Sequence, residues 1–412
     1  MSASRVIRVI ARLNTGGPAI HTVLLSAGLA DGRWRTRLVT GVVDAGEGDM
    51  TYFARANGIE PTVIAELGRR PALTGDLRAF AKLLALFWRE RPDIVHTHTT
   101  KAGALGRAAA LLYNLAALAC GRRRARIVHT FHGHLFHGYF AAPIARALVW
   151  GEWMLALMTD RIVTVSDSVR DDLVDRYRIC PLRKVTVVPL GFDFEWVNHL
   201  DEHAGSMRRA LHLPSDAVVV GVVGRLTEIK NHALLFSALS RMKRDTIRAL
   251  ILGDGELRTA LEATVVDLEL GDEVVFTGWQ RDRAQMFADL DIVCLTSRNE
   301  GTPAALIEAM AAGRAFVSTK VGGVADLMVG EPTSHPAGFE IYANGILTRP
   351  DEPDILAAAL THLAARPELR RAMGAVGQAA VLKRFGKERL LEEMEAIYTG
   401  LIDADGRVAC AR

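Results

Sequence analysis

The sequence predicts an α/β protein with two Rossmann-like domains, each built around a parallel sheet. Short runs of β-branched residues alternate with longer helical patterns along almost the whole chain. These runs are nearly continuous in apolar residues, which is typical of strands that helices cover on both faces. The runs form two series, and a chain of 412 residues is too long for one ordinary core. Two domains, each with its own sheet, are therefore expected.

Each series supplies the strands of one domain. The expected strands of the first are 6–13, 36–41, 93–98, 126–132, 161–166 and 185–191. Those of the second are 217–226, 248–255, 274–279, 291–297 and 315–320. The strand signal stops between Pro189 and Pro214, and an amphipathic helix expected at 387–402 could cross back to the first domain. The predicted domains are 1–192 together with 386–412, and 193–385.

Composition indicates a globular protein of a reducing compartment. Half of the residues are apolar, and the four cysteines are scattered without a CxxC pair, which argues against a disulfide framework or a zinc ribbon. The first residues run into a strand and lack the long apolar core of a signal peptide. The segment Ala102–Ala119 is the best candidate for a membrane span, but Arg107 and Asn114 interrupt it and favour a buried helix. We expect a cytoplasmic protein.

The net charge of +3 hides an asymmetry between the two halves. Residues 1–190 carry 26 Lys and Arg against 15 Asp and Glu, and the remainder carries 24 against 32, so the halves have charges of +11 and −8. A basic first half could contact anionic lipid or a phosphorylated acceptor, or it could be ordinary solvated surface. Lipid contact would make the protein peripheral at the inner face of the membrane. Nucleic acid is not expected, because the basic residues are not interleaved with aromatic ones.

The stretch SRNEGTPAALIEAMAAG, residues 297–313, marks a candidate site. Glu300 lies in the loop that leaves a predicted strand at its carboxyl end, where open parallel sheets bind ligands. Thr302 is predicted as the N-cap of the following helix, Pro303 as its first residue and Gly313 as its end. Free amides at such a helix start favour an anion.

Glu308 falls in the second turn of that helix, in a run that is otherwise apolar. A buried carboxylate needs polar partners, and ligand hydroxyls would serve. The alternative is that Glu300 caps the helix and Glu308 is solvated.

Further candidates follow other strands. In GRLTEIKN, Arg225 and Lys230 lie on one loop and could clamp a diphosphate, with arginine as a fork and lysine as a point charge. In NTGGPAIH, Gly16 and Gly17 open a helix and would let a phosphate or sugar approach the backbone. The turn is not a full GxGxxG, so it is a poor match to a dinucleotide site.

Histidines gather in the first half. His96 and His98 share one face of a strand, and a second group follows at His129, His132, His134 and His137. A metal cluster is conceivable, but the spacing fits no zinc signature, and histidines that line a polar cleft are favoured. The sequence Asp289-Leu290-Asp291 precedes a strand at its amino end and is discounted as a metal motif.

Taken in order, these motifs resemble a known family. The glycine pair after the first strand, TFHG, GRLxxxKN, GDGE and E-x7-E before EAMAAG resemble retaining glycosyltransferases of the family-four type. The resemblance spans about residues 8–330 and the last helix. It implies the GT-B fold, in which two Rossmann-like domains face each other across a cleft. DIVHTHTTKAG and HTFHGH further resemble members that build bacterial surface polysaccharides and lipid-linked oligosaccharides.

The resemblance implies a role for each matched residue. Arg225 and Lys230 would neutralise the donor diphosphate, and Glu308 would bind the ribose. Glu300 would bind the transferred sugar. The other matched positions are the sugar pocket at Gly301, Thr302 and Pro303, the sugar contact at His132, the phosphate or acceptor loop at Gly16 and Gly17, and the nucleoside surroundings at Asp254, Gly255 and Trp279. Many members carry Phe-Gly where this chain has Thr302-Pro303, which affects the sugar pocket.

The implied reaction is transfer of a sugar from a nucleotide-diphosphate sugar to a hydroxyl, with retention of the anomeric configuration. UDP-hexose or UDP-N-acetylhexosamine is the favoured donor, with GDP-mannose second, and the acceptor would be a glycan or a lipid-linked sugar. No cofactor and no metal are expected, because the two cations would replace the metal. The alternatives are a GT-B-shaped nucleotide-sugar 2-epimerase and a non-catalytic partner subunit that binds sugar nucleotide.

Overall fold

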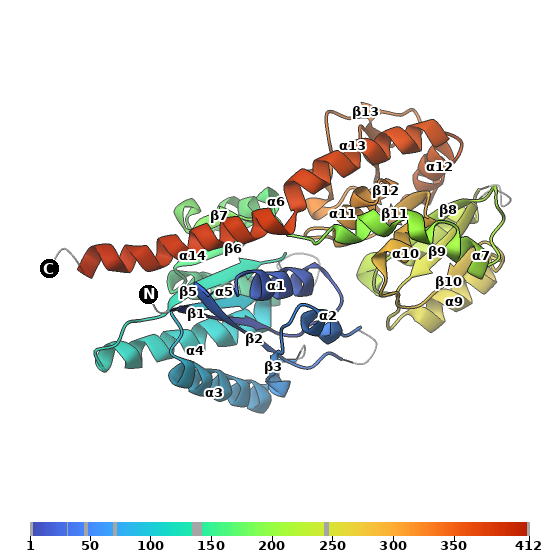
Figure 1. Ribbon diagram of the computed structural model, residues 1–412. Coiled ribbons are helices and arrows are strands. Elements are labelled where there is room, and N and C mark those ends of the chain that lie inside the picture. Colours follow the sequence, from blue (N-terminus) through green and yellow to red (C-terminus); the bar gives the residue numbers. More distant parts are fainter. Residues whose placement is uncertain are drawn as a thin grey trace. The chain divides into compact units, whose positions relative to one another are not determined.

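The chain divides into two compact α/β units, each with one sheet of mainly parallel strands (Figure 1). The computed structural model describes residues 3–30, 32–44, 48–68, 72–133, 142–242 and 247–409. Unit 1 comprises Met1–Phe192 and Lys387–Arg412, and unit 2 comprises Asp193–Gly386. The predicted fold class, with two Rossmann-like domains, is confirmed. Gly386, placed with the first domain from the sequence, falls in unit 2.

The sheet of unit 1 has seven parallel strands in the order β3-β2-β1-β4-β5-β6-β7. These are β1 Ser4–Ile10, β2 Trp34–Thr40, β3 Thr62–Val63, β4 Ile94–His98, β5 Arg126–Phe131, β6 Arg161–Thr164 and β7 Val185–Val187. In the β1–β4 register, Arg8 lies beside His96 and Ile10 lies beside His98. Because side chains alternate along a strand, these four residues point to the same face of the sheet.

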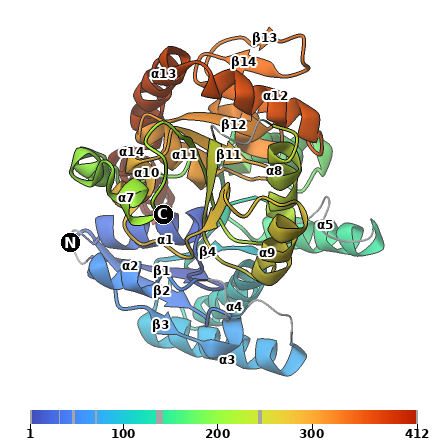
Figure 2. The ribbon, with the colours of Figure 1, turned by 90° about the vertical axis from the view of Figure 1, so that its right-hand side faces the viewer.

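Helices cover both faces of this sheet (Figures 1 and 2). The helices of unit 1 are α1 Gly17–Gly28, α2 Thr51–Ala56, α3 Leu73–Glu90, α4 Thr100–Ala119, α5 Ala142–Leu157, α6 Asp167–Asp171 and α14 Lys387–Ala409, with shorter turns η1 Ala65–Leu67, η2 Asp172–Arg176 and η3 Leu182–Lys184. One core lies between the sheet and α3 and α4, around Leu83 and Phe87. Another lies beneath α1 and α14, around Leu25, Met394 and Tyr398.

Among the described residues, α4 alone is long and apolar enough to cross a membrane, and half of that stretch is buried. It packs against α3 and β4 in the core of unit 1, and Arg107 on it is buried and ion-paired with Glu152. This is the buried core helix that the sequence predicts.

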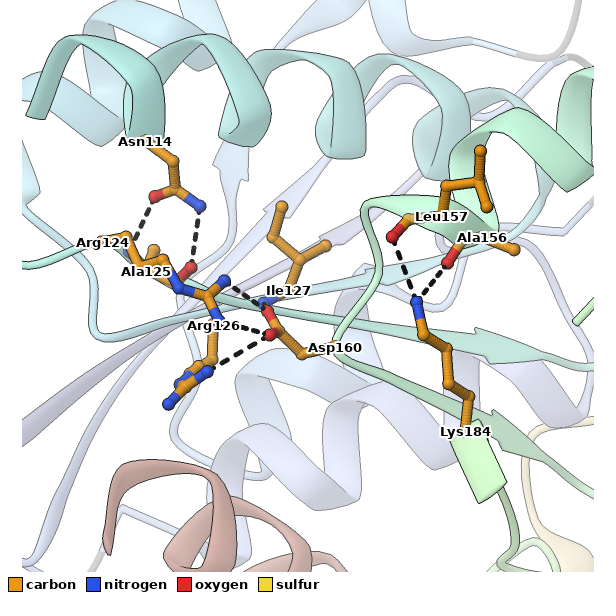
Figure 3. Close-up of polar contacts among 9 residues, drawn as sticks. All are labelled: Asn114, Arg124, Ala125, Arg126, Ile127, Ala156, Leu157, Asp160 and Lys184. Atoms are coloured by element: carbon orange, nitrogen blue, oxygen red, sulfur yellow. Dashed lines mark hydrogen bonds and ion pairs between the residues drawn. The ribbon is translucent and has the colours of Figure 1, made fainter. Parts of the chain in front are cut away.

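Charged residues fix the amino edge of the first sheet (Figure 3). Asp160 accepts hydrogen bonds from the Arg124 and Arg126 side chains and from the amide of Ile127. Asn114 of α4 pairs with both backbone groups of Ala125. Part of the positive charge of the first half is therefore neutralised within unit 1.

The sheet of unit 2 has eight strands in the order β10-β9-β8-β11-β12-β15-β14-β13. They are β8 Val218–Val223, β9 Ile247–Leu252, β10 Val274–Phe276, β11 Ile292–Leu295, β12 Ala315–Thr319, β13 Thr333–Ser334, β14 Glu340–Tyr342 and β15 Gly345–Thr348. The pairs β15–β14 and β14–β13 are antiparallel and the others are parallel. The sequence did not predict β13 to β15, because runs of two to four residues give little periodic signal.

The helices of unit 2 enclose this sheet. They are α7 Ser206–Ala210, α8 His232–Leu239, α9 Arg258–Asp267, α10 Arg283–Ala288, α11 Ala304–Ala311, α12 Pro353–Ala364 and α13 Pro367–Phe385, with turns η4 Glu195–His199, η5 Asp201–His203, η6 Glu228–Lys230 and η7 Gly322–Leu327. A core around Phe236, Ile251 and Phe339 joins the strands to α8, α9 and α12. Asp289 accepts three backbone hydrogen bonds around the start of α7, and Asp291 pairs with Arg208, so both aspartates of the discounted motif are structural.

Candidate functional site

At the carboxyl edge of the second sheet, the loops after β8 and β9 lie in direct backbone contact. A Cβ atom on Gly253 would lie 1.9 Å from the carbonyl oxygen of Gly224, and one on Gly255 would lie 2.5 Å from that of Leu226. The amide of Leu226 donates to the carbonyl of Asp254. The glycines of GDGE are therefore required for this close approach of the loop that carries Arg225, two residues after β8.

Lys230 and Glu300 meet at the same edge. The Lys230 Nζ atom lies 2.5 Å from Glu300 Oε1, and the Ser297 hydroxyl lies 2.5 Å from the same oxygen. Two further bonds join these loops, from the Thr296 hydroxyl to the Lys230 carbonyl and from the Arg298 amide to the carbonyl of Ile229. The loop after β8 and the loop after β11 thus present one charged cluster.

A second glycine pair, Gly322 and Gly323, packs against the backbone of Glu300 and Gly301. A Cβ atom on Gly322 would lie 1.9 Å from the carbonyl oxygen of Glu300, and one on Gly323 would lie 1.9 Å from that of Gly301. Gly323 also donates its amide to the Glu300 carbonyl. Only glycine fits here, so these two residues set the position of the acid. The sequence signal that could have identified them is the GG pair that begins three residues after the end of β12.

The helix after Glu300 begins one residue later than the sequence predicts. Pro303, not Thr302, is the N-cap of α11, and Ala304 is the first helical residue. Pro303 serves because its extended backbone presents its carbonyl to the Leu306 and Ile307 amides, and no side chain caps the helix. The Ala304 amide is one of the free donors of this helix start, since a helix leaves its first amides without intrahelical acceptors.

The end of α11 is as predicted. Gly313 has φ +67° and follows the C-cap residue Ala312. The Gly313 amide donates to the Met310 carbonyl, and the Arg314 amide donates to the Ala309 carbonyl. This pair of hydrogen bonds is the Schellman motif, which is typical of a helix that ends at a glycine.

Glu308 is buried on α11 and has a partner that the sequence did not reveal. Arg283 Nε of α10 lies 3.1 Å from Glu308 Oε1. Burial raises the pKa of Glu308, and the positive charge of Arg283 offsets part of this rise. The two acids of the E-x7-E pattern are thus held by different cations, Glu300 by Lys230 and Glu308 by Arg283.

The remaining donor-side candidates lie near the neighbouring strand ends. Asp254 accepts from the Gly255 amide at 2.8 Å and from Arg258 at 3.2 Å. Trp279 is half-buried and follows β10 by three residues. Gly301 and Thr302 are half-buried beside Glu300. The Thr302 hydroxyl is buried and has no hydrogen-bond partner in the described part of the chain.

In unit 1, Gly16 and Gly17 begin α1 after β1, as expected. Gly16 is the N-cap with φ +152°, and its carbonyl accepts from the amides of Ala19 and Ile20. An open hollow of unit 1, 330 Å³ in volume, follows β2 and is lined by Thr40, Gly41, Val42, Val43, Asp44, Gly48, Asp49, Thr51 and Val63.

His132 lies at the end of β5 and forms a hydrogen-bonded pair with His98. The His98 Nδ1 and His132 Nε2 atoms are 3.0 Å apart, and the rings of His21 and His132 are 5.0 Å apart, edge to face. Burial lowers the pKa of His132 to about 3, so its imidazole is neutral at physiological pH. His129 points to the other face of the sheet, against Gly103 of α4. His134 and His137 lie outside the described residues.

Two family models match the chain. The model of glycosyltransferase family 4 matches residues 15–196, and the model of glycosyl transferases group 1 matches residues 217–366. Between them the matches cover the main part of both units. The chain belongs to these family-four, group 1 glycosyltransferases. It is therefore an enzyme that transfers a sugar residue.

Curated relatives of this glycosyltransferase carry specific names. The UDP-Gal:alpha-D-GlcNAc-diphosphoundecaprenol alpha-1,3-galactosyltransferase of Escherichia coli is 28% identical over 265 residues, which are 63% of this chain and 66% of that protein. The D-inositol 3-phosphate glycosyltransferase of Actinosynnema mirum is 29% identical over 390 residues, which are 85% of this chain and 87% of that protein. The chain thus spans just under two thirds of the galactosyltransferase.

Solved structures share the fold of this glycosyltransferase. Anabaena HepE, solved in complex with UDP, has a TM-score of 0.75 at 20% identity and covers 96% of this chain and 100% of its own. Sucrose-phosphate synthase of Thermosynechococcus elongatus has a TM-score of 0.77 at 19% identity, with 97% and 100% covered. The fold is GT-B.

Proposed function

We propose that this glycosyltransferase moves a sugar from a UDP-sugar to a hydroxyl of a lipid-linked or glycan acceptor, with retention of configuration and without a metal. The observation that carries the proposal is the charged cluster of Lys230, Glu300 and Ser297 at the carboxyl edge of unit 2. The names of two similar proteins support UDP, since HepE was solved with UDP and the Escherichia coli relative is named for UDP-Gal. A hexose or an N-acetylhexosamine is the proposed transferred sugar, and GDP-mannose is the second choice.

Unit 2 would bind the donor. Arg225 and Lys230 present positive charge after the first strand of this sheet, where a diphosphate would meet both side chains. The free amides at the start of α11 and the helix dipole favour the same negative group. With the diphosphate bound, Lys230 would bridge it to Glu300, and the second oxygen of Glu300 would accept hydrogen bonds from sugar hydroxyls.

Glu308 would accept hydrogen bonds from the ribose hydroxyls. Its carboxylate is buried, and Arg283 holds one of its oxygens, Oε1. The positive charge of Arg283 opposes the rise in the Glu308 pKa that burial causes, and so favours the carboxylate form that would act as the acceptor. Gly301, Thr302 and Pro303 would frame the sugar, while Asp254, Gly255 and Trp279 would border the nucleoside.

The proposed reaction needs no protein nucleophile. The bond from the anomeric carbon to the diphosphate oxygen breaks, and the acceptor oxygen forms a bond on the same face of the sugar. The acceptor proton passes to an oxygen of the departing phosphate, so UDP leaves with the electron pair of the broken bond. Arg225 and Lys230 would stabilise the negative charge that develops on the diphosphate, which is the main catalytic contribution of the chain.

Unit 1 would bind the acceptor. His132 would contact the transferred sugar, and Gly16 and Gly17 would lie near the phosphates or the acceptor. The names of both curated relatives describe acceptors that carry phosphate, a diphosphoundecaprenol sugar and an inositol 3-phosphate. We therefore extend the proposal to an acceptor that carries a phosphate group.

A lipid-linked acceptor implies that the protein works at the cytoplasmic face of a membrane. The helix α5 exposes a stripe of large apolar side chains, of which Trp150 is 65% exposed and Leu157 is 59% exposed. Exposed tryptophans suit the interface of a bilayer, and basic residues such as Arg146 suit anionic lipid. Sedimentation with phosphatidylglycerol vesicles tests this contact. Trp150→Ala should release the protein from vesicles and preserve turnover of a water-soluble acceptor.

The decisive experiment is a screen of purified protein against a panel of nucleotide sugars. A true donor should raise the melting temperature, because a ligand that binds only the folded state stabilises it. Transfer to a prenyl-diphosphate sugar with the α-configured product seen by NMR would support the proposal. Interconversion of the donor sugar without an acceptor would indicate an epimerase, and absence of any turnover would indicate a binding subunit; either result would overturn the proposal.

A further inference from the structure

Arg8 is a buried cation that has no anionic partner among the described residues. Its side chain is 0% exposed in the middle of β1, on the face of the first sheet that α1 and α14 cover. The Nε, Nη1 and Nη2 atoms of Arg8 have no hydrogen-bond acceptor in the part of the chain that the structure describes. The guanidinium lies 5.6 Å from the ring centre of Tyr398 on α14, which stabilises the charge only in part.

Arg107, another fully buried arginine of unit 1, shows what such a charge normally requires. Arg107 is also 0% exposed, and it lies 2.7 Å from Glu152 and donates to the Gly103 carbonyl. A buried charge without a partner is strongly unfavourable, because the desolvation of the ion is not offset. Arg8 therefore lacks the kind of anionic partner that Arg107 has.

Three histidines with unused nitrogens lie on the same side. His21 has no hydrogen-bond partner for either ring nitrogen among the described residues, and His98 Nε2 and His132 Nδ1 are likewise buried without one. Ring nitrogens of these three residues lie within 4.8 Å of one another. The neighbouring His96 is different, because Tyr398 and Thr130 satisfy both of its nitrogens at 2.6 and 2.7 Å.

Charge selects between the two kinds of ligand that this cluster could hold. Three imidazole nitrogens can bind a divalent metal. However, burial lowers the pKa of His21, His96 and His98, and Arg8 lies close enough for its positive charge to lower each of them further. A second cation would add repulsion to a group that already lacks a counterion, whereas an anion would meet the guanidinium and the imidazole N–H groups together.

We propose that Arg8, His21, His98 and His132 form an anion site in unit 1, and that its ligand is a phosphate group of the acceptor. The proposal rests on the proposed function in one respect, since it takes the acceptor to be phosphorylated. The donor diphosphate has its own cations, Arg225 and Lys230, in unit 2. His132 is the partly exposed member of the site, so the ligand would enter from the side of His132.

The first arm of the test measures binding without catalysis. Pyrophosphate is titrated calorimetrically into the full chain that is already saturated with UDP, so that the donor cations are occupied. Wild type should bind pyrophosphate. Arg8→Met should lose at least about tenfold in affinity, which corresponds to about 1.4 kcal/mol, and Arg8→Lys should retain part of it. Unchanged pyrophosphate affinity in Arg8→Met would overturn the site.

Matched measurements exclude a merely structural role. Without ligand, Arg8→Met should melt at the same temperature as wild type or higher, because it removes an unpaired buried charge. Arg107→Met should melt lower, because it leaves Glu152 unpaired in the core. An Arg8→Met protein that melts far below wild type, or stoichiometric zinc binding that His98→Asn abolishes, would contradict an anion site.

The second arm identifies the source of the phosphate. A short-chain prenyl-diphosphate sugar and the same sugar without diphosphate are compared as acceptors. Arg8→Met should raise KM for the first at least about tenfold and leave the second unaffected, while the affinity for UDP stays within about twofold of wild type. Equal loss with both acceptors would overturn the assignment to acceptor phosphate. Failure of UDP-sugar turnover in wild type would overturn the proposed function instead, and the pyrophosphate arm would still decide the anion site.

Discussion

Lys230 and Glu300 form a salt bridge of 2.5 Å at the carboxyl edge of the second sheet, although 70 residues separate them in the chain. The lysine enters from the loop after β8 and the glutamate from the loop after β11. The pair therefore couples the proposed diphosphate cation to the proposed sugar-binding acid. A change at one of them alters the charge that the other presents to the donor.

Lys230→Ala should reduce kcat/KM by about 10²-fold or more, because one preorganised charge contact to the leaving group is worth about 3 kcal/mol. Arg225→Ala should have a loss of similar size. Arg298→Ala is the matched control, since Arg298 is an exposed cation on the neighbouring loop that pairs with Asp351. Steady-state kinetics with saturating acceptor measure the effect, and circular dichroism should show folded variants. Near-normal transfer by Lys230→Ala would remove the lysine from the clamp.

Gly323→Ala should disable the donor site through the backbone. The added Cβ would lie 1.9 Å from the Gly301 carbonyl oxygen, so the loop that carries Glu300 must shift. We expect transfer to fall by at least about tenfold, since small misplacement of a positioning group is costly. Gly271→Ala is the control, because a Cβ there meets nothing within 4 Å. Equal activity of the two variants would show that the loop tolerates the shift.

The sequence alone predicts the layers of the fold and the loops that carry the candidate residues. It does not predict which side chains of these loops and helices pair with each other. Apolar runs such as Val218–Val223 identify buried strands because burial on both faces leaves no polar position. The partner of Glu308 is Arg283, on another helix, and nothing in the local pattern of either residue indicates the other. The burial of Arg8 could not be predicted from the sequence either, because it becomes visible only in the assembled sheet.

The start of α11 shows a second reason why the structure differs from the sequence prediction. Threonine is a good N-cap by local preference, but the carbonyl of Pro303 accepts the first helical amides and Thr302 stays outside the helix. The Gly322–Gly323 pair also escaped prediction, because a glycine required by tertiary contact looks in the sequence like a glycine required by a turn.

Glu308→Gln should change how the stability of unit 2 depends on pH. Burial raises the pKa of Glu308 above its ordinary value of 4.5. Between that value and the raised pKa, the folded protein binds more protons than the unfolded chain, so stability falls as pH rises through this window. The glutamine variant lacks this loss of stability, because glutamine does not titrate. Urea unfolding of unit 2, which acid should leave folded after unit 1, should give equal free energies of unfolding near pH 4 and a more stable variant near pH 8.

The same variant should bind UDP more weakly, by about tenfold, because a neutral amide replaces a charged acceptor of the ribose hydroxyls. Glu262→Gln, which changes a carboxylate on α9 that pairs with Arg258, serves as the control for charge alone. A Glu308→Gln protein that is less stable than wild type near pH 8 would show that the ion pair with Arg283 outweighs the burial of the acid.

Acid should unfold unit 1 before unit 2. Burial lowers the pKa of five histidines in unit 1, which are His21, His96, His98, His129 and His132. In the unfolded chain they titrate near pH 6.5, so below that pH the unfolded state takes up protons that the folded state does not. Each histidine then removes about 1.4 kcal/mol of stability per pH unit. Five together can exhaust a typical domain stability of about 5–15 kcal/mol within about two pH units.

Hydrogen exchange with peptide resolution can follow both units of the intact chain from about pH 7 to about pH 5. Peptides from β4 and β5 should lose protection first, whereas peptides from β8 and β11 should keep it. In unit 2, His232 is the histidine whose pKa burial lowers most clearly, to about 4, so its share of the acid sensitivity is small. His129→Gln should shift the loss in unit 1 to lower pH, because the glutamine cannot titrate. Simultaneous loss of protection in both units would contradict the histidine explanation.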